Sequence, residues 1–389
     1  MYIKRNAEEK LQKFAKQYPV VTITGPRQSG KTTLCQHVFP DKKYVSLEDI
    51  DNRKYAMNDP RGFLSEYSNG VIIDEVQKVP DLLSYIQGIV DENQIKGEFI
   101  LTGSSQFELS RSISQSLAGR TALLKLFPFS YVEVYNSAEY SAEWVNKVIY
   151  KGFYPRIHSD GLDATEAMSA YVETYVERDV RQFYDVKDLN LFSTFLKLTA
   201  ARTGQLLNYS NIADDCGVTI PTIKNWISIL EQSYIIFLLQ PYHSSVKKRL
   251  IKTPKVYFYD VGLCAYLNGA KREDHIGALP NKGSLFENFV ISEVLKMNAH
   301  NSFKDEFYFF RDKNKKEIDL LINKGLKIYP YEIKSALTYI SDFTKNLKYL
   351  ADLTKSDNIG NVIYAGETHK RSDFTVFNYF DFFKDYFDK

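Results

Sequence analysis

The segment Gly25–Thr32, with the sequence GPRQSGKT, constrains the fold of this chain more than any other feature. It matches the pattern G-x-x-x-x-G-K-S/T, a glycine-rich loop whose backbone N–H groups turn inward around an anion. The apolar run Val20–Thr24 precedes the loop as a predicted strand, and Thr33–Val38 continues it as a predicted helix. Because a helix N-terminus adds positive potential, the sequence predicts a nucleoside triphosphate site between this strand and this helix.

Different residue types in the loop have different expected roles. Lys31 supplies a cation for the β- and γ-phosphates, which also makes it a candidate catalytic residue, and the Thr32 hydroxyl is an expected ligand of Mg²⁺. ATP and Mg²⁺ are therefore the expected ligands. The predicted nucleotide-binding residues here are Gly25, Pro26, Arg27, Gln28, Ser29, Gly30, Lys31, Thr32 and Thr33.

A second motif, Val71–Val76, places two acids after three β-branched residues. Asp74 is expected to hold Mg²⁺, and Glu75 to polarise the water that attacks the γ-phosphate. Acidic residues often end strands, so the motif gains its weight from following the phosphate loop. The predicted strand Lys43–Leu47 lies between the two motifs in the chain and is expected to separate them in the sheet.

Two further candidates follow the acidic motif. The predicted strand Phe99–Ser105 ends in hydroxyl residues, of which Thr102 or Ser104 is expected either to contact the γ-phosphate or merely to end the strand. Arg120 follows Ser116–Gly119 and is a candidate catalytic arginine that reaches a neighbouring subunit, which predicts a homo-oligomer. The alternative is a surface arginine after a glycine that ends a helix.

These motifs together resemble a known group of proteins. GPRQSGKT, VIIDEV, LTGSS and SLAGR, followed by LFPFS, look like the motifs of prokaryotic AAA-type ATPases. The C-terminal half resembles the domain of unknown function that accompanies them, as in Lys252–Leu263, so the resemblance covers nearly the whole chain. It implies ATP hydrolysis, a winged-helix segment and a restriction-endonuclease-like terminal domain, and it implies no particular biological process.

Composition and pattern define the rest of the expected architecture. The first 130 residues alternate strand and helix patterns, which favours a mostly parallel sheet covered by helices. The expected fold class is α/β, with an AAA-type P-loop NTPase sheet, a helical and winged-helix segment, and a restriction-endonuclease-like α/β domain. The predicted domains are an ATPase core at 1–130, a lid-like helical segment at 131–203, a winged helix at 204–275 and the nuclease-like domain at 276–389.

Charge and cysteine content exclude several classes. Lys and Arg number 50 against 48 Asp and Glu, so no global field draws the chain to nucleic acid or membrane. The cysteines Cys35, Cys216 and Cys264 are too scattered for a disulfide framework or a zinc knuckle. The apolar run Tyr234–Leu239 is far too short to span a membrane. We therefore expect a cytoplasmic protein that does not bind membranes.

The middle of the chain contains a predicted helix-turn-helix. Tyr209–Gly217 is predicted to be a short helix ended by its glycine, and Thr219–Glu231 a second helix with Thr219 as its N-cap. Apolar residues at helical spacing predict one buried face on the second helix. The opposite face is expected to be exposed and carries Thr222, Lys224 and Asn225.

Two predicted strands, Tyr234–Gln240 and Val256–Tyr259, flank the basic stretch Val246–Lys255. A helix-turn-helix followed by a basic β-wing is the winged-helix pattern, which places a helix in the major groove of DNA and the wing on phosphates. DNA is thus an expected partner, and a protein-binding module or an ATPase lid is the alternative. The predicted contact residues are Thr222, Lys224, Asn225, Lys247, Lys248 and Arg249.

The C-terminal part contains the spacing Asp319…Glu332-x-Lys334, which is typical of restriction-endonuclease-like sites. Asp319 and Glu332 are expected to bind Mg²⁺ together with Glu287, while Lys334 positions water or stabilises the developing charge. All three residues of the spacing are candidate catalytic residues. The alternatives are structural: Glu287 follows Ser284 at capping-box spacing, and Glu/Lys alternation is common on solvated strands.

The favoured interpretation is a Mg²⁺-dependent ATPase whose nucleotide state moves a winged-helix, DNA-binding and nuclease-like module. Two alternatives remain open at this point. One is a nucleotide-dependent switch that binds protein partners and has no DNA role. The other is an ATP-regulated, metal-dependent DNA endonuclease.

Overall fold

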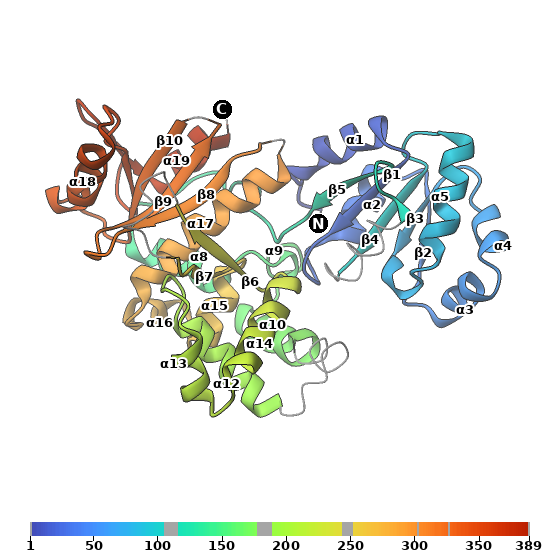
Figure 1. Cartoon of the computed structure of the whole chain (residues 1–389), viewed down its shortest axis with the longest axis horizontal. Coiled ribbons are helices and arrows are strands. Elements are labelled where there is room, and N and C mark those ends of the chain that lie inside the picture. Colours follow the sequence, from blue (N-terminus) through green and yellow to red (C-terminus); the bar gives the residue numbers. More distant parts are fainter. Residues whose placement is uncertain are drawn as a thin grey trace. The chain divides into compact units, whose positions relative to one another are not determined.

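The computed structural model describes residues 2–104, 116–176, 189–242, 252–301, 303–325 and 327–387 (Figure 1). The chain forms two compact units. The first contains residues 1–129, with 232–234 and 299–302. The second contains residues 130–231, 235–298 and 303–389.

A five-stranded parallel sheet forms the centre of the first unit (Figure 1). Its strands in spatial order are β2 (Lys43–Ser46), β3 (Val71–Asp74), β4 (Phe99–Gly103), β1 (Val20–Thr24) and β5 (Thr121–Lys125). The strands β1, β3 and β4 are buried along their whole length, which explains their continuous apolar sequences. The P-loop-type α/β fold expected from the sequence is confirmed.

Two hydrophobic clusters cover the two faces of this sheet, because successive strand residues point to opposite sides. Val21, Ile23 and Ile72 pack in one cluster with α1 (Ala7–Gln17) and α2 (Lys31–Val38). The alternate residues of the same strands pack in the other cluster with helices α3 (Ile50–Asn58), α4 (Pro60–Ser65) and α5 (Leu82–Asn93). A short 3₁₀ turn, η1 (Val76–Lys78), follows β3.

The sheet order corrects one expectation. β4 lies between β1 and β3, whereas β2 is an edge strand, so the predicted separation of the two nucleotide motifs by Lys43–Leu47 is wrong. Sequence order alone cannot give this arrangement, because the connections cross over. Since all five strands are parallel, the carboxyl ends of β1, β3 and β4 meet at one edge of the sheet, where ligands of such folds bind.

The second unit begins with helices and continues into a mixed sheet. The helical elements are α7 (Tyr131–Val134), α8 (Ala142–Lys151), α9 (Pro155–Ser159), α10 (Ala164–Tyr171), the π-helical turn η2 (Val172–Val176), α12 (Leu189–Ala201), α13 (Tyr209–Cys216), α14 (Ile220–Gln232), α15 (Val261–Leu267), α16 (Glu273–Ala278), α17 (Lys282–His300), η3 (Ser341–Thr344), α18 (Lys345–Thr354) and α19 (Tyr379–Phe387). None of the helices in the described ranges is long and apolar enough to cross a membrane.

The sheet of this unit contains eight strands in the order β12-β13-β11-β10-β9-β8-β6-β7. The predicted wing strands belong to it, because β6 pairs in parallel with β8 through Gln240 and Pro241. The strands are β6 (Ile236–Pro241), β7 (Lys255–Phe258), β8 (Glu306–Arg311), β9 (Glu317–Lys324), β10 (Lys327–Lys334), β11 (Asn361–Tyr364), β12 (His369–Lys370) and β13 (Thr375–Asn378).

Aromatic side chains and one buried ion pair pack around α17. Lys296 donates from Nζ to Glu293 Oε1 at 2.7 Å, and both residues are fully buried. Glu293 also accepts a hydrogen bond from the backbone N–H of Tyr131 at 2.5 Å. Tyr131 packs edge-on against Tyr379. These contacts fix the start of the helical segment to α17.

Candidate nucleotide site

The phosphate loop has the backbone conformation that its glycines predict. Gly25, Gln28 and Gly30 all have positive φ values, of 150°, 58° and 87°. A Cβ atom on Gly25 would lie 2.0 Å from the carbonyl oxygen of Leu126, which no rearrangement of a side chain could relieve. The loop therefore passes so close to the end of β5 that only glycine fits at its first position.

Lys31 is turned back onto the loop. Its ammonium donates to the carbonyl oxygens of Gly25 at 3.0 Å and Pro26 at 2.8 Å. Burial lowers the pKa of this ammonium, and the carboxylates of Glu75 and Asp74 act in the opposite direction. The Lys31 ammonium carries three N–H donors, and these are equally suited to bind phosphate oxygens. The buried Ser29 hydroxyl has no hydrogen-bond partner among the described residues, which also fits a loop built to receive an oxyanion.

Hydroxyl groups from three elements surround Asp74 at the end of β3. Thr32 Oγ1 lies 3.2 Å from both carboxylate oxygens, and the Thr102 hydroxyl donates to Oδ1. Tyr44 on β2 donates to Oδ2 at 3.0 Å. Burial and the adjacent Asp74 raise the pKa of Tyr44 to about 12. The carboxylate and the Thr32 hydroxyl are hard oxygen ligands of the kind that Mg²⁺ prefers, so these residues fit the expected cation.

Glu75 lies beside Asp74 in the chain but has other partners. Its backbone is left-handed, with a φ of 55°, and this turn redirects the carboxylate after the strand ends. Ser104 Oγ donates to Glu75 Oε2 at 3.0 Å, and the Gln77 amide donates to the same oxygen. The sequence predicted that Thr102 or Ser104 either contacts the γ-phosphate or merely ends the strand. It did not single out Gln77, in the turn after β3, or Tyr44, whose position depends on the pairing of β2 with β3.

The remaining predicted residues of the first unit lie as follows. Arg120 forms a two-pronged ion pair with Asp91 of α5, at 2.5 and 2.7 Å, and is partly exposed. Its predicted role in a neighbouring subunit stays a prediction. Thr33 follows Thr32 on α2. The positive charge of Arg27 contributes to the lowered pKa of Lys31, although burial is the largest cause.

The predicted DNA-contacting residues are only partly described. On α14, Lys224 and Asn225 are exposed and Thr222 is half-buried, while Ile223, Trp226, Ile227 and Leu230 are buried. Lys247, Lys248 and Arg249 lie outside the described residues. One member of the predicted basic stretch is misassigned: Lys255 belongs to β7, is 1% exposed, and is bound by carboxylates.

The C-terminal carboxylates meet as the spacing predicts. Lys334 Nζ on β10 donates to Asp319 Oδ2 on β9 at 3.1 Å and to Glu332 Oε2 at 2.5 Å. Burial and Asp319 raise the pKa of Glu332 to about 9. Burial alone would raise the pKa of Asp319, but the positive charges of Lys334 and Lys255 outweigh burial, so the pKa is lowered.

Glu287 takes part in the same cluster through Lys255. Lys255 Nζ lies 3.0 Å from Glu287 Oε1 and 2.6 Å from Glu317 Oε1, and Tyr257 donates to Glu287 at 2.5 Å. Because α17 already begins at Lys282, Ser284 lies inside the helix and is not its N-cap, so the capping-box alternative for Glu287 is wrong. In the part of the chain that the structure describes, no group of three or more His, Cys, Asp or Glu residues is arranged to hold a metal ion. Lysines face these carboxylates instead.

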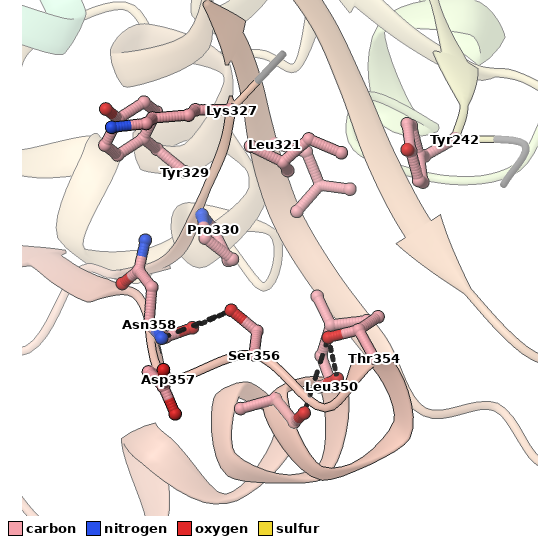
Figure 2. A pocket seen from close by; sticks show the side chains of 12 residues that line it. Tyr242, Leu321, Lys327, Tyr329, Pro330, Leu350, Thr354, Ser356, Asp357 and Asn358 are labelled. Carbon is pink, nitrogen blue, oxygen red and sulfur yellow. Dashed lines mark hydrogen bonds between the residues drawn. The ribbon is translucent and has the colours of Figure 1, made fainter.

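A cavity of about 740 Å³ lies elsewhere in the second unit, between α18 and strands β9 and β10 (Figure 2). Leu321, Pro330 and Leu350 give it an apolar floor, and Tyr242 stands on the β6 side (Figure 2). Its lining includes none of the residues of the Asp319–Lys334 cluster. The cavity and the carboxylate cluster are therefore separate features.

Family models match three stretches of the chain. Residues 17–135 match an AAA domain, and residues 142–274 and 282–380 match two domains of unknown function, DUF8612 and DUF4143. Together with the sheet topology and the nucleotide motifs, the match over residues 17–135 supports a P-loop NTPase fold of AAA type for the first unit. In the chain, this P-loop unit is followed by a helical and then an α/β segment, which match domains of unknown function.

Relatives and solved structures are similar to longer stretches of the chain at low sequence identity. An uncharacterised protein of Mycobacterium tuberculosis is 28% identical over 338 residues, which cover 86% of this chain and 74% of that protein. An uncharacterised protein of Haemophilus influenzae is 22% identical over 405 residues, and the match covers 96% of this chain and 95% of that protein. A Walker-type ATPase of Pyrococcus abyssi is similar with a TM-score of 0.46 and 14% identity, covering 68% of this chain and 96% of that structure.

Proposed function

We propose that this protein is a Mg²⁺-dependent ATP hydrolase. The observation that carries the proposal is the convergence of Lys31, Thr32, Asp74 and Glu75 at the carboxyl ends of β1 and β3. Phosphate-binding donors, oxygen ligands for a cation and a second carboxylate are the parts that phosphoryl transfer to water requires. The AAA domain match supports this proposal.

Each residue has a distinct proposed role in the reaction. The loop N–H groups and Lys31 bind the phosphates, and Thr32 and Asp74 hold Mg²⁺, which neutralises charge on the phosphates when bound. Glu75 orients the attacking water and accepts its proton. Ser104 and Gln77 hold the Glu75 carboxylate in place, so they act as positioning residues.

Phosphate release from ATP by the full chain tests the proposal. We expect Glu75→Gln to reduce the rate at least a hundredfold while ATP binding persists, because the amide keeps the shape and loses the base. Lys31→Ala is expected to abolish binding. Exposed Lys345→Ala, in the other unit, is the matched control and should leave both unchanged. Equal rates for Glu75→Gln and the wild type would overturn the proposal.

DNA is the proposed partner of the α13–α14 segment. The exposed pair Lys224 and Asn225 on α14, opposite a buried apolar face, supports this proposal. Binding of duplex DNA in a gel shift should weaken with salt and with Lys224→Ala/Asn225→Ala. If duplex DNA neither binds nor stimulates phosphate release, the nucleotide-dependent protein switch becomes the better account.

A metal-dependent endonuclease is the second candidate, favoured by the meeting of Asp319, Glu332 and Lys334. The lysines that already neutralise these acids argue against it. Cleavage of DNA with Mg²⁺ or Mn²⁺ that disappears in both Asp319→Ala and Lys334→Ala would support it. Cleavage that persists in both variants would exclude this site.

Oligomerisation is proposed from Arg120, which would complete a neighbouring subunit's site in trans. Sedimentation with a non-hydrolysable ATP analogue should then show an assembly. A chain that stays monomeric at high concentration would contradict this role and would leave Arg120 as the surface partner of Asp91.

A further inference from the structure

Arg5 is a buried arginine of the N-terminal segment that none of the nucleotide motifs includes. Its side chain is 3% exposed although it precedes the first helix, α1. Nη1 donates to the carbonyl oxygen of Ser29, in the phosphate loop, at 2.9 Å. Nη2 donates to the carbonyl oxygen of Phe127 at 2.7 Å.

These contacts require the geometry of an arginine. The planar guanidinium reaches two carbonyls on segments far apart in the chain, and its face lies 4.6 Å from the ring centre of Phe129. A lysine ammonium is a compact point charge on one nitrogen, so it lacks the planar fork that places separate nitrogens on the two carbonyls and a flat face over the ring. Arg5 thereby joins the phosphate loop to the segment that follows β5.

The contact with Ser29 acts on one peptide unit of the loop. The carbonyl of Ser29 and the N–H of Gly30 belong to the same planar trans peptide and point in opposite directions. Holding the carbonyl on Arg5 therefore turns the Gly30 N–H away from Arg5. A charged donor on the carbonyl also polarises the peptide and makes its N–H a stronger donor.

This orientation is not set by the local backbone alone. Gln28 and Gly30, on either side of Ser29, both have positive φ, where glycine in particular can adopt several conformations. An external hydrogen bond is a direct means of selecting one orientation of the peptide between them.

We infer that Arg5 is a positioning residue for nucleotide binding: it fixes the Ser29–Gly30 peptide so that the Gly30 N–H is presented to a phosphate of the bound nucleotide. The inference deepens the proposed ATPase function and rests on it for the identity of the ligand. Arg5 acts through the loop and does not contact the reacting atoms.

The test uses the full chain and its Arg5→Lys variant. Calorimetric titration with ATP and Mg²⁺ should show a Kd about tenfold higher for Arg5→Lys, the loss expected for one charge-assisted hydrogen bond. The kcat at saturating ATP should change by less than about threefold, because Lys31, Asp74 and Glu75 stay in place. Amide hydrogen exchange without nucleotide should become faster across residues 25–34.

Leu11→Ala is the matched control. Leu11 is fully buried on α1, in the hydrophobic cluster on the α1–α2 face of the sheet, which includes neither carbonyl partner of Arg5. Its truncation should therefore lower the Tm without changing the Kd for ATP or selectively speeding exchange in the loop. If Leu11→Ala raises the Kd as much as Arg5→Lys does, or if Arg5→Lys matches the wild type in both measurements, the inference is wrong. If the wild type binds no ATP, the proposed function fails, while the exchange data still decide whether Arg5 positions the loop.

Discussion

Asp74 and Glu75 are neighbours in the chain, yet different residues hold them. Asp74 accepts hydrogen bonds from the hydroxyls of Thr32, Tyr44 and Thr102, whereas Glu75 is held by Ser104 and Gln77. The left-handed backbone at Glu75 separates the two carboxylates. The proposed roles of Asp74 in cation binding and of Glu75 in activating water should therefore be separable by mutation.

The Ser104→Ala variant should separate these two properties. Loss of the hydroxyl frees the Glu75 carboxylate to adopt other positions, so we expect kcat to fall roughly tenfold while the Kd for ATP stays within about twofold. Steady-state phosphate release and calorimetry measure the two quantities. Ser65→Ala, at an exposed hydroxyl on α4, is the control. A Kd that rises in step with the loss of kcat would show that Ser104 serves binding instead.

His158 should make the second unit sensitive to acid. Burial lowers the pKa of His158 to about 4, below the value of about 6.5 for an unfolded chain. The folded state therefore disfavours the proton, and the stability present above about pH 6.5 is lost as the pH falls toward 4. Between pH 7 and pH 5 the loss is about 2 kcal/mol.

The His158→Gln variant tests this assignment by urea unfolding at both pH values. The glutamine side chain does not titrate, so the difference in stability between pH 7 and pH 5 should shrink by about 2 kcal/mol. The nearby cations Lys151 and Lys296 act on His158 in the same direction as burial. An unchanged difference would assign the acid sensitivity to other groups.

At the scale of elements, the loop after β1 has no room for a side chain at its first position, whereas the helix α5 of the same unit has room for one in its middle. A Cβ on Gly25 would meet the Leu126 carbonyl oxygen at 2.0 Å, whereas a Cβ on Gly88, in the middle of α5, would meet nothing within 4 Å. The same glycine-to-alanine change should therefore have opposite effects at the two sites.

We expect Gly25→Ala to lower the stability of the first unit and to abolish ATP binding, because the backbone of β5 or of the loop must move. Gly88→Ala should stabilise the unit by about 0.5–1 kcal/mol through the higher helix propensity of alanine. Urea unfolding and ATP titration of both variants provide the measurement. Normal ATP binding by Gly25→Ala would contradict the close approach of the loop to β5.

Local sequence patterns predicted many of these elements correctly. The error in the predicted sheet concerns which strands are neighbours, and that depends on contacts between distant parts of the chain. The strand Val20–Thr24 has the predicted bounds, and the helices Tyr209–Cys216 and Ile220–Gln232 differ from their predicted bounds by one residue, because apolar runs and periodicity are local signals. The position of β4 between β1 and β3 depends on crossover connections that the sequence does not encode locally.

In the candidate site, too, residues in contiguous motifs could be predicted, whereas residues brought in by the fold could not. The phosphate loop and the paired acids form contiguous motifs, so the sequence alone identifies Lys31 and Asp74. Tyr44 reaches Asp74 from the neighbouring strand β2, and Gln77 reaches Glu75 from the turn after β3, outside the paired-acid motif. Arg5 reaches the loop from a segment with no motif. Lys255 looked like an exposed cation in a basic stretch, although tertiary packing places it among carboxylates.

At the scale of the whole molecule, the near-neutral net charge of +2 conceals a concentration of opposite charges inside the second unit. Lys255, Lys334 and Arg311 pair with the buried or half-buried carboxylates of Glu287, Glu317, Asp319 and Glu332. Such a network contributes little net stability when complete and costs much when one member is removed.

Lys255→Met should therefore destabilise the second unit by about 3–5 kcal/mol, because it leaves the half-buried Glu287 without its cation and leaves Glu317 with Arg311 alone. The control is Lys345→Met, since Lys345 is exposed and lies 3.9 Å from the equally exposed Asp342, so its loss should cost less than about 0.5 kcal/mol. Denaturant unfolding compares the two. Similar midpoints would show that the cluster is more hydrated than its burial indicates.

Calorimetric titration of ATP into the pure, folded chain with Mg²⁺ tests the central claim most directly. The account predicts saturable binding of one nucleotide per chain, which Lys31→Ala abolishes and Glu75→Gln retains. Absence of any heat of binding in a wild-type chain that is shown to be folded would contradict the assignment of residues 25–32 as a nucleotide site.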